Sequence, residues 1–141
     1  MIVRKTQIEA FDRAAEPAFR QRVKDYLREK HPSEIVRFTD AVVALREIPD
    51  AKLDALLERG IARARSHGLT WESTLNAFVT MMVTVAPNFD QQRVVRAALA
   101  DKDRPSNFRT KELDQRVSQA DWKRARAAYD PAAWQTRLAG K

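Results

Sequence analysis

Between residues 50 and 99, apolar side chains recur at steps of three or four, and this spacing constrains the fold more than any other feature of the chain. Side chains spaced in this way lie on one face of an α-helix. The three stripes are Leu53, Leu56, Leu57, Gly60, Ile61 and Ala64, then Trp71, Leu75, Phe78, Val79, Met82 and Val85, then Val94, Val95, Ala98 and Leu99. The chain has only 3 glycines and 6 prolines to interrupt helices. We therefore expect an all-α protein, a compact bundle of about five to seven helices.

Residues that start or stop helices divide these stripes. Asp50, Thr70 and Asp90 each precede a stripe and are expected to cap the helix that follows. Gly68 follows the first stripe and can adopt the left-handed conformation that closes a helix. Gly60 lies inside a helix, where glycine costs about 1 kcal/mol relative to alanine, so we expect it to permit close approach of a second helix.

The first 30 residues carry another helical stripe. It comprises Ile8, Phe11, Ala15, Phe19, Val23 and Leu27. Pro17 interrupts it, which leaves either a break with a new helix at Pro17 or a bend in one helix. We expect one long helix with a bend, ending near His31 because Pro32 disfavours helix in the residue before it.

The segment 33–46 contains residues of both kinds. Its β-formers are Ile35, Val36, Phe38, Val42 and Val43. Ala41, Leu45 and the charges between them are more typical of a helix. We expect a helix here, closed by Pro49.

The chain changes character after residue 100. Residues 101–109 are polar and rich in turn formers, which predicts a linker or long loop. The basic, aromatic and helical tail, residues 101–141, has too little apolar content for a domain of its own. We expect it to pack on the 1–100 core or on a partner within one overall domain, anchored by the aromatic residues Phe108, Trp122, Tyr129 and Trp134. Asp130 and Pro131 are suited to the cap and first turn of its last helix.

Composition narrows the class of protein further. The chain has 141 residues, no cysteine and a net charge of +7. Without cysteine, disulfides and thiolate chemistry are excluded, which fits a cytoplasmic location. No stretch approaches the roughly 20 apolar residues of a membrane span, so we expect none.

Residues that could carry out catalysis or hold a metal are few and isolated. His31 and His67 each lie at an expected helix end without ligand partners at metal spacing, so we expect them to interact with exposed helix carbonyls. Asp50, Asp54 and Glu58 share a helix face that could bind a cation. However, nearby basic residues on the same helix, Lys52, Arg59 and Arg63, favour surface ion pairs. We expect no catalytic, cofactor-binding or metal-binding residues and a non-enzymatic role.

Basic side chains instead predict binding to an acidic partner. The residues expected to make that contact are Arg20, Lys24, Arg28, Trp122, Arg126 and Trp134. The alternative is a nucleic-acid-binding helical protein, because bases near aromatic residues can bind phosphates and stack on single strands. Glu16, Asp25 and Glu29 share the first helix and dilute its positive charge, which favours a protein partner.

One stretch resembles a known family. Residues 56–72 have the sequence LLERGIARARSHGLTWE, followed by FVTMM at 78–82 and APNFD at 86–90. The pattern is similar to that of small all-helical bacterial proteins encoded near type VI secretion spike and effector genes, over roughly residues 5–95. His67 and Ala86 stand where that family has tyrosine and glycine. The resemblance implies no catalytic residues, and it implies an adaptor, chaperone, effector-partner or immunity role in a bacterial secretion or toxin system.

Overall fold

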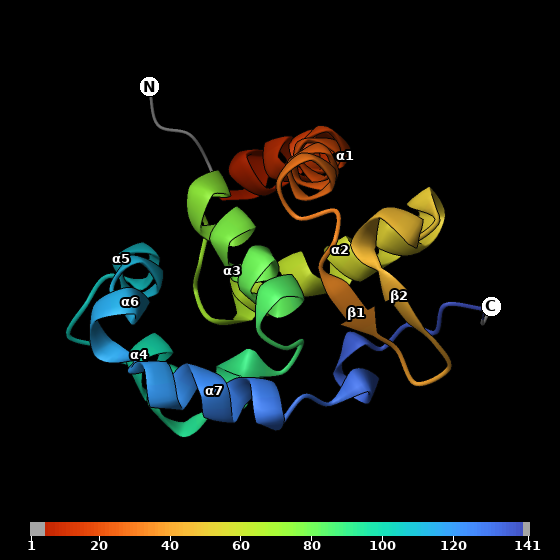
Figure 1. Ribbon diagram of the computed structural model, residues 1–141. Helices are drawn as coiled ribbons and strands as arrows, with labels where there is room; N and C mark the ends of the chain where they lie inside the picture. The colour runs from red at the N-terminus through yellow and green to blue at the C-terminus, as the bar shows by residue number, and fades with distance from the viewer. Residues whose placement is uncertain (1–4, 140–141) are drawn as a thin grey trace.

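The computed structural model describes the backbone of residues 5–139 and the side chains of residues 16–139. The described residues form seven α-helices and one two-stranded sheet, which confirms the predicted mostly helical fold (Figure 1). The helices are α1 (Lys5–Lys30), α2 (Asp50–Ser66), α3 (Glu72–Thr84), α4 (Arg93–Leu99), α5 (Ser106–Lys111), α6 (Leu113–Arg116) and α7 (Gln119–Ala127). Three short 3₁₀ helices, η1 (Leu45–Glu47), η2 (Phe89–Gln91) and η3 (Pro131–Trp134), join them.

The packing of α2 against α3 forms the centre of the fold. A Cβ atom at Gly60 would lie 3.2 Å from Met82 Sδ and 3.3 Å from Val79 Cγ2, distances shorter than ordinary van der Waals contact. The glycine therefore allows the two helices to approach closely, as the sequence predicted. Leu53, Leu57 and other residues of the predicted stripes are buried here.

Helix α1 lies across the top of this core in Figure 1. It is one helix that continues through Pro17 and ends at Lys30, one residue before the predicted end. Phe19, Val23 and Leu27 are buried against the core. The rest of the predicted stripe, Ile8, Phe11 and Ala15, lies outside the residues whose side chains are described.

The prediction of a helix over 33–46 was wrong, because this segment forms a β-hairpin. Strands β1 (Ile35–Arg37) and β2 (Val42–Ala44) pair in antiparallel fashion, with Val36 opposite Val43. Exposed and buried side chains alternate along the first strand, since Ile35 is exposed and Val36 is buried. That period of two belongs to a strand, and burial of alternate β-branched residues outweighed the helical propensity of the charges between them.

Three predicted helix caps were also wrong. Helix α2 has Pro49 at its N-cap, with Asp50 in the first turn. Helix α3 has Trp71 and not Thr70 at its N-cap, and the Asn107 side chain accepts hydrogen bonds from the backbone of Thr70 and Trp71 just before the helix. Helix α4 has Gln92 at its N-cap and not Asp90, and the Gln92 side chain accepts hydrogen bonds from the backbone of Val94 and Val95. The predicted closure of α2 by Gly68 is confirmed by its φ of +85°.

The tail packs on the core. Leu113, Val117, Ala125 and Trp134 belong to the same cluster of buried residues as Leu57 and Phe78. Part of the predicted 101–109 linker is helical, because α5 begins at Ser106. In Figure 1, α4 to α6 cover one side of α3, and α7 crosses the lower edge of the molecule toward η3. Asp130 caps η3 with Pro131 in its first turn, as predicted, although the helix is 3₁₀.

Candidate functional site

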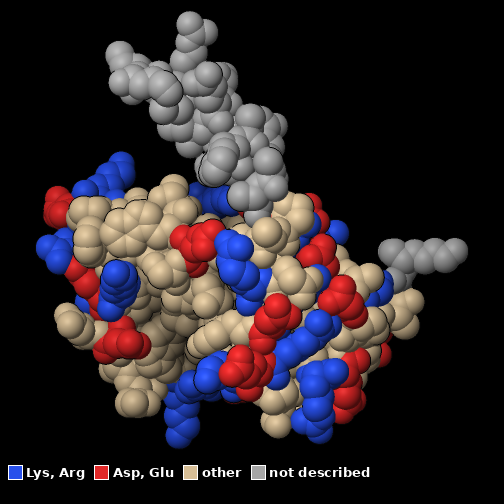
Figure 2. All heavy atoms as spheres, turned by 90° about the horizontal axis from the view of Figure 1, so that it is seen from above, with Lys and Arg blue, Asp and Glu red and all other residues tan. Residues whose placement is uncertain are grey.

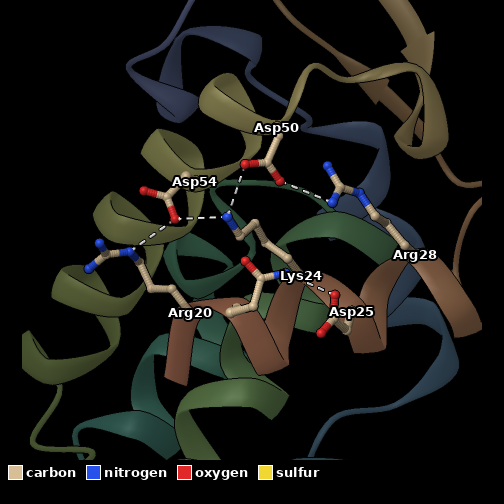
Figure 3. Close-up of polar contacts among 7 residues, drawn as sticks. Arg20, Lys24, Asp25, Arg28, Asp50 and Asp54 are labelled. Atoms are coloured by element: carbon tan, nitrogen blue, oxygen red, sulfur yellow. Dashed lines mark hydrogen bonds and ion pairs between the residues drawn. The ribbon is translucent and has the colours of Figure 1, made fainter. Parts of the chain in front are cut away.

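The basic residues predicted on α1 form ion pairs within the molecule (Figure 3). Arg20 Nε lies 3.2 Å from Asp54 Oδ1, and Arg28 Nη1 lies 3.0 Å from Asp50 Oδ1. Between them, Lys24 Nζ lies 3.3 Å from Asp50 Oδ2 and 3.2 Å from Asp54 Oδ1. Hydrogen bonds from Arg28 and then Lys24 hold the pKa of Asp50 below its usual range. These three cations therefore join α1 to α2.

This network also shows which residues pair with the acidic face of α2. Asp50 and Asp54 were expected to pair with basic residues of their own helix, but they pair with residues of α1. Arg63, one of the expected partners, pairs with Asp90. Among the described residues, no group of three or more potential ligand side chains is arranged to hold a metal ion. The face viewed from the α1 side accordingly shows basic and acidic side chains interleaved (Figure 2).

The three residues predicted in the tail have different environments. Trp134 is 1% exposed and donates a 2.8 Å hydrogen bond from Nε1 to Tyr129 Oη, so it belongs to the core. Trp122 is half-buried against the same core, and Arg126 is exposed on α7. Within residues 16–139, no hydrogen bond or ion pair joins these three residues to the basic residues predicted on α1.

A buried carboxylate near the end of α2 was missed by the sequence reasoning. Asp90, 1% exposed, accepts hydrogen bonds at Oδ2 from Arg63 Nε at 2.7 Å and His67 Nε2 at 2.9 Å. His67 therefore contacts a carboxylate and not the helix carbonyls that were expected. The spacing of Arg63 and His67, one helical turn apart, was the available signal.

A groove lies between α2 and the C-terminal segment. It consists of two adjoining clefts of about 430 and 530 Å³, and Arg59 and Gln135 line both. Lys52 and Arg137 line the first cleft, and Arg63 lines the second. We call these two clefts the α2 groove.

The α2 groove differs from the other clefts in charge. Among the described residues that line it there are four basic side chains and no carboxylate. Three further clefts each contain an acidic side chain, Glu72, Asp114 or Glu34. A concave surface lined by one sign of charge concentrates the opposite charge, so this groove attracts anions.

Arg59 lines both clefts of the α2 groove. It is exposed, and no hydrogen bond or ion pair occupies its guanidinium group within the part of the chain that the structure describes. By contrast, Arg63 Nε is bonded to Asp90. Arg59 therefore offers a full set of donors to a carboxylate or phosphate.

The wall opposite α2 follows η3. Gln135 closes that helix in the left-handed conformation, with a φ of +55°. The buried hydroxyl of Thr136 has no hydrogen-bond partner among the described residues. The wall itself is held in place because both carboxylate oxygens of Asp40 accept hydrogen bonds, from Leu138 N and Ala139 N, each 2.9 Å long.

This chemistry suits anion binding. The groove supplies positive charge and hydrogen-bond donors, while the described residues that line it include no carboxylate or histidine that could act as a general base. The described helices also include none with the length and hydropathy needed to cross a membrane. Comparisons with protein-family models, curated proteins and solved structures find no match to this chain.

Proposed function

We propose that this chain is a non-enzymatic interaction protein that binds an acidic segment of a partner protein in the α2 groove. The unpaired guanidinium of Arg59, at the junction of two clefts that lack carboxylates among their described lining residues, is the observation that carries this proposal. It also moves the expected contact from α1 to α2, because the α1 cations already have acidic partners in the fold.

The partner is proposed to belong to a bacterial secretion or toxin system. The support is the resemblance of residues 56–72 to proteins encoded near type VI secretion genes, and an adaptor, chaperone or immunity role in the cytoplasm follows from it. Coexpression with the proteins encoded by neighbouring genes tests this part. Formation of a complex that the Arg59→Glu variant fails to form supports it, and a lack of any complex contradicts it.

Acidic polymers test the groove without knowledge of the partner. We expect wild-type protein to bind polyglutamate in low salt and the Arg59→Glu variant to bind at least about tenfold more weakly, since a favourable charge contact becomes repulsive. Arg96→Glu is the matched control, because Arg96 is also exposed on a helix but does not line the groove. Equal losses in both variants would show that only net charge matters.

The nucleic-acid alternative is decided in the same assay. Single-stranded oligonucleotides replace polyglutamate, and salt is varied because release of counterions makes phosphate binding steeply salt-dependent. Oligonucleotide binding that exceeds polyglutamate binding and depends on Arg59 would replace the acidic protein with nucleic acid as the partner.

A further inference from the structure

Three basic side chains that line the α2 groove come from one helix, and their spacing bears on the conformation of a ligand. This inference rests on the proposed function and concerns the same site. We infer that the groove binds an extended segment in which acidic side chains alternate with other residues, acid-x-acid-x-acid.

The spacing of cations along α2 is the first step. Lys52, Arg59 and Arg63 line the groove from one helix. At 1.5 Å per residue, Arg59 and Arg63 are about 6 Å apart along the helix axis, and Lys52 and Arg63 are about 16 Å apart. The cations thus form a row parallel to α2.

An extended chain repeats at nearly the distance between Arg59 and Arg63, whereas Lys52 lies about 10 Å from Arg59 along the axis. Its residues advance by about 3.3 Å each and alternate between two faces, so every second side chain on one face is about 6.6 Å from the next. Three acids in the pattern acid-x-acid-x-acid therefore span about 13 Å on one face. The flexible lysine side chain can accommodate the difference of about 3 Å between this span and that of the cations. One carboxylate then lies near the Nη groups of Arg63, whose Nε is bonded to Asp90, one near Arg59 and one toward Lys52.

The opposite wall fits a ligand that passes along the groove. Gln135 lines both clefts, and Arg137 adds a cation facing α2 in the first cleft. A ligand confined to one cleft would not use both ends of this row. An extended segment that follows α2 contacts both clefts.

Two hexapeptides of identical composition test the inference. Both contain three aspartates and three threonines and have blocked ends, with the aspartates at positions one, three and five in the first and at one, two and three in the second. Because adjacent side chains of a strand point to opposite faces, the second peptide loses at least one matched contact. We expect the alternating peptide to bind about tenfold more tightly, the factor that corresponds to one charged hydrogen bond.

A double-mutant cycle then locates the central contact. Replacement of the middle aspartate of the alternating peptide by asparagine and replacement of Arg59 by alanine should each weaken binding, and the two effects should not add. Additive effects would place that aspartate away from Arg59 and overturn the proposed register. Arg96→Ala serves as the control and should leave the affinity for both peptides unchanged.

The outcomes separate this inference from the proposed function. Equal binding of the two peptides, with loss of both in Arg59→Glu, overturns the alternating pattern and leaves an acidic ligand in the groove. Binding of polyglutamate but of neither hexapeptide also overturns the pattern, since matched contacts then do not suffice. If polyglutamate and both peptides bind Arg59→Glu as tightly as wild type, the proposed function itself fails.

Discussion

Asp90 is a buried carboxylate whose charge is balanced by side chains from a single helix. Arg63 and His67 both bond to Oδ2, whereas the buried Oδ1 has no partner among the described residues. Because a buried charge is tolerated only when it is paired, these contacts connect η2 firmly to the end of α2. They also fix the position of Arg63 at one end of the α2 groove.

Replacement of Asp90 by asparagine should therefore destabilise the protein. Arg63 and His67 lose a charged acceptor, and the amide introduces donors without partners, so we expect the free energy of unfolding to fall by about 2–3 kcal/mol. Urea denaturation measures this change. Asp103→Asn, which alters an exposed side chain, should change it by less than about 0.5 kcal/mol. Similar effects of the two variants would contradict the role given to Asp90.

The contribution of Asp90 should depend on pH in a defined direction. Burial by itself raises the pKa of Asp90, but the hydrogen bonds from His67 and Arg63 lower it below 3.8 overall. A lowered pKa in the folded state means that the stabilisation is present above pH 3.8 and is lost as pH falls further. The difference between wild type and Asp90→Asn should thus shrink as the pH of the urea titrations is lowered below 3.8. A difference that grows in acid would contradict this account.

At the scale of elements, the turn that leads into α3 is held by a side chain from α5. Asn107 Oδ1 accepts hydrogen bonds from Thr70 N at 2.9 Å, Trp71 N at 3.1 Å and Thr74 Oγ1 at 2.8 Å. Its Nδ2 donates to Thr70 Oγ1. Asn107 thus fixes the turn that leads into α3, and it links the tail to the core.

Removal of the Asn107 amide should destabilise the turn before α3. We expect Asn107→Ala to lower the free energy of unfolding by about 1 kcal/mol, because the backbone N–H groups of Thr70 and Trp71 and the hydroxyl of Thr74 lose their acceptor. Asn107→Asp keeps the acceptor oxygens and should recover most of the loss. Chemical denaturation of wild type and the two variants distinguishes these hydrogen bonds from simple packing, since packing alone would make Asn107→Asp no more stable than Asn107→Ala.

Tyr129 joins the hairpin to the tail in a similar way. Its hydroxyl accepts hydrogen bonds from Arg37 N at 3.0 Å and Trp134 Nε1 at 2.8 Å, and burial raises its pKa above 10.0. The Arg37 guanidinium also lies 4.1 Å from the centre of the Tyr129 ring. One side chain therefore contacts both a strand and η3.

Loss of that hydroxyl should leave two donors without an acceptor. We expect Tyr129→Phe to lower the free energy of unfolding by about 1–2 kcal/mol and to increase hydrogen exchange at the Arg37 amide. Tyr26→Phe is the matched control, since Tyr26 is 37% exposed and no hydrogen bond occupies its hydroxyl among the described residues. Unchanged exchange at Arg37 would contradict the link between hairpin and tail.

These elements show where prediction from sequence reached its limit. The stripes of α2 and α3 and the closure at Gly68 were predictable because they depend on neighbours within one or two helical turns. The hairpin was missed although its β-formers lie within one segment, because the sequence did not show which of them are buried. The contacts of Tyr129 with Arg37 and of Asn107 with Thr70 were not predictable, because the partners are 92 and 37 positions apart. Only tertiary structure brings such partners together.

At the scale of the whole molecule, the net charge of +7 says little about which cations are available. Sequence placed binding on Arg20, Lys24 and Arg28, because a helix seen alone does not show that acids of another helix face it. The groove was missed for the same reason, since its cations on α2 were expected to pair with carboxylates on their own helix. Pairing between α1 and α2 determines which positive charges remain for a ligand.

This division of cations predicts that stability and binding respond to different substitutions. The Lys24 side chain is 6% exposed and paired with two carboxylates, so Lys24→Met should lower the Tm by about 3 °C. It should leave the affinity for polyglutamate within about twofold of wild type. The substitution lowers the net charge of +7 by one, and salt screens the effect of that charge on a ligand bound at a distance.

Arg59→Ala should behave in the opposite way. We expect its Tm to stay within about 1 °C of wild type, because no described residue loses a partner. Its affinity for polyglutamate should fall about tenfold, since the central donor of the α2 groove is gone. Thermal melts and titrations of the two variants check both halves. If Lys24→Met weakens binding as much as Arg59→Ala, the α1 surface takes part in binding after all, and the ion pairs in Figure 3 must open when the ligand binds.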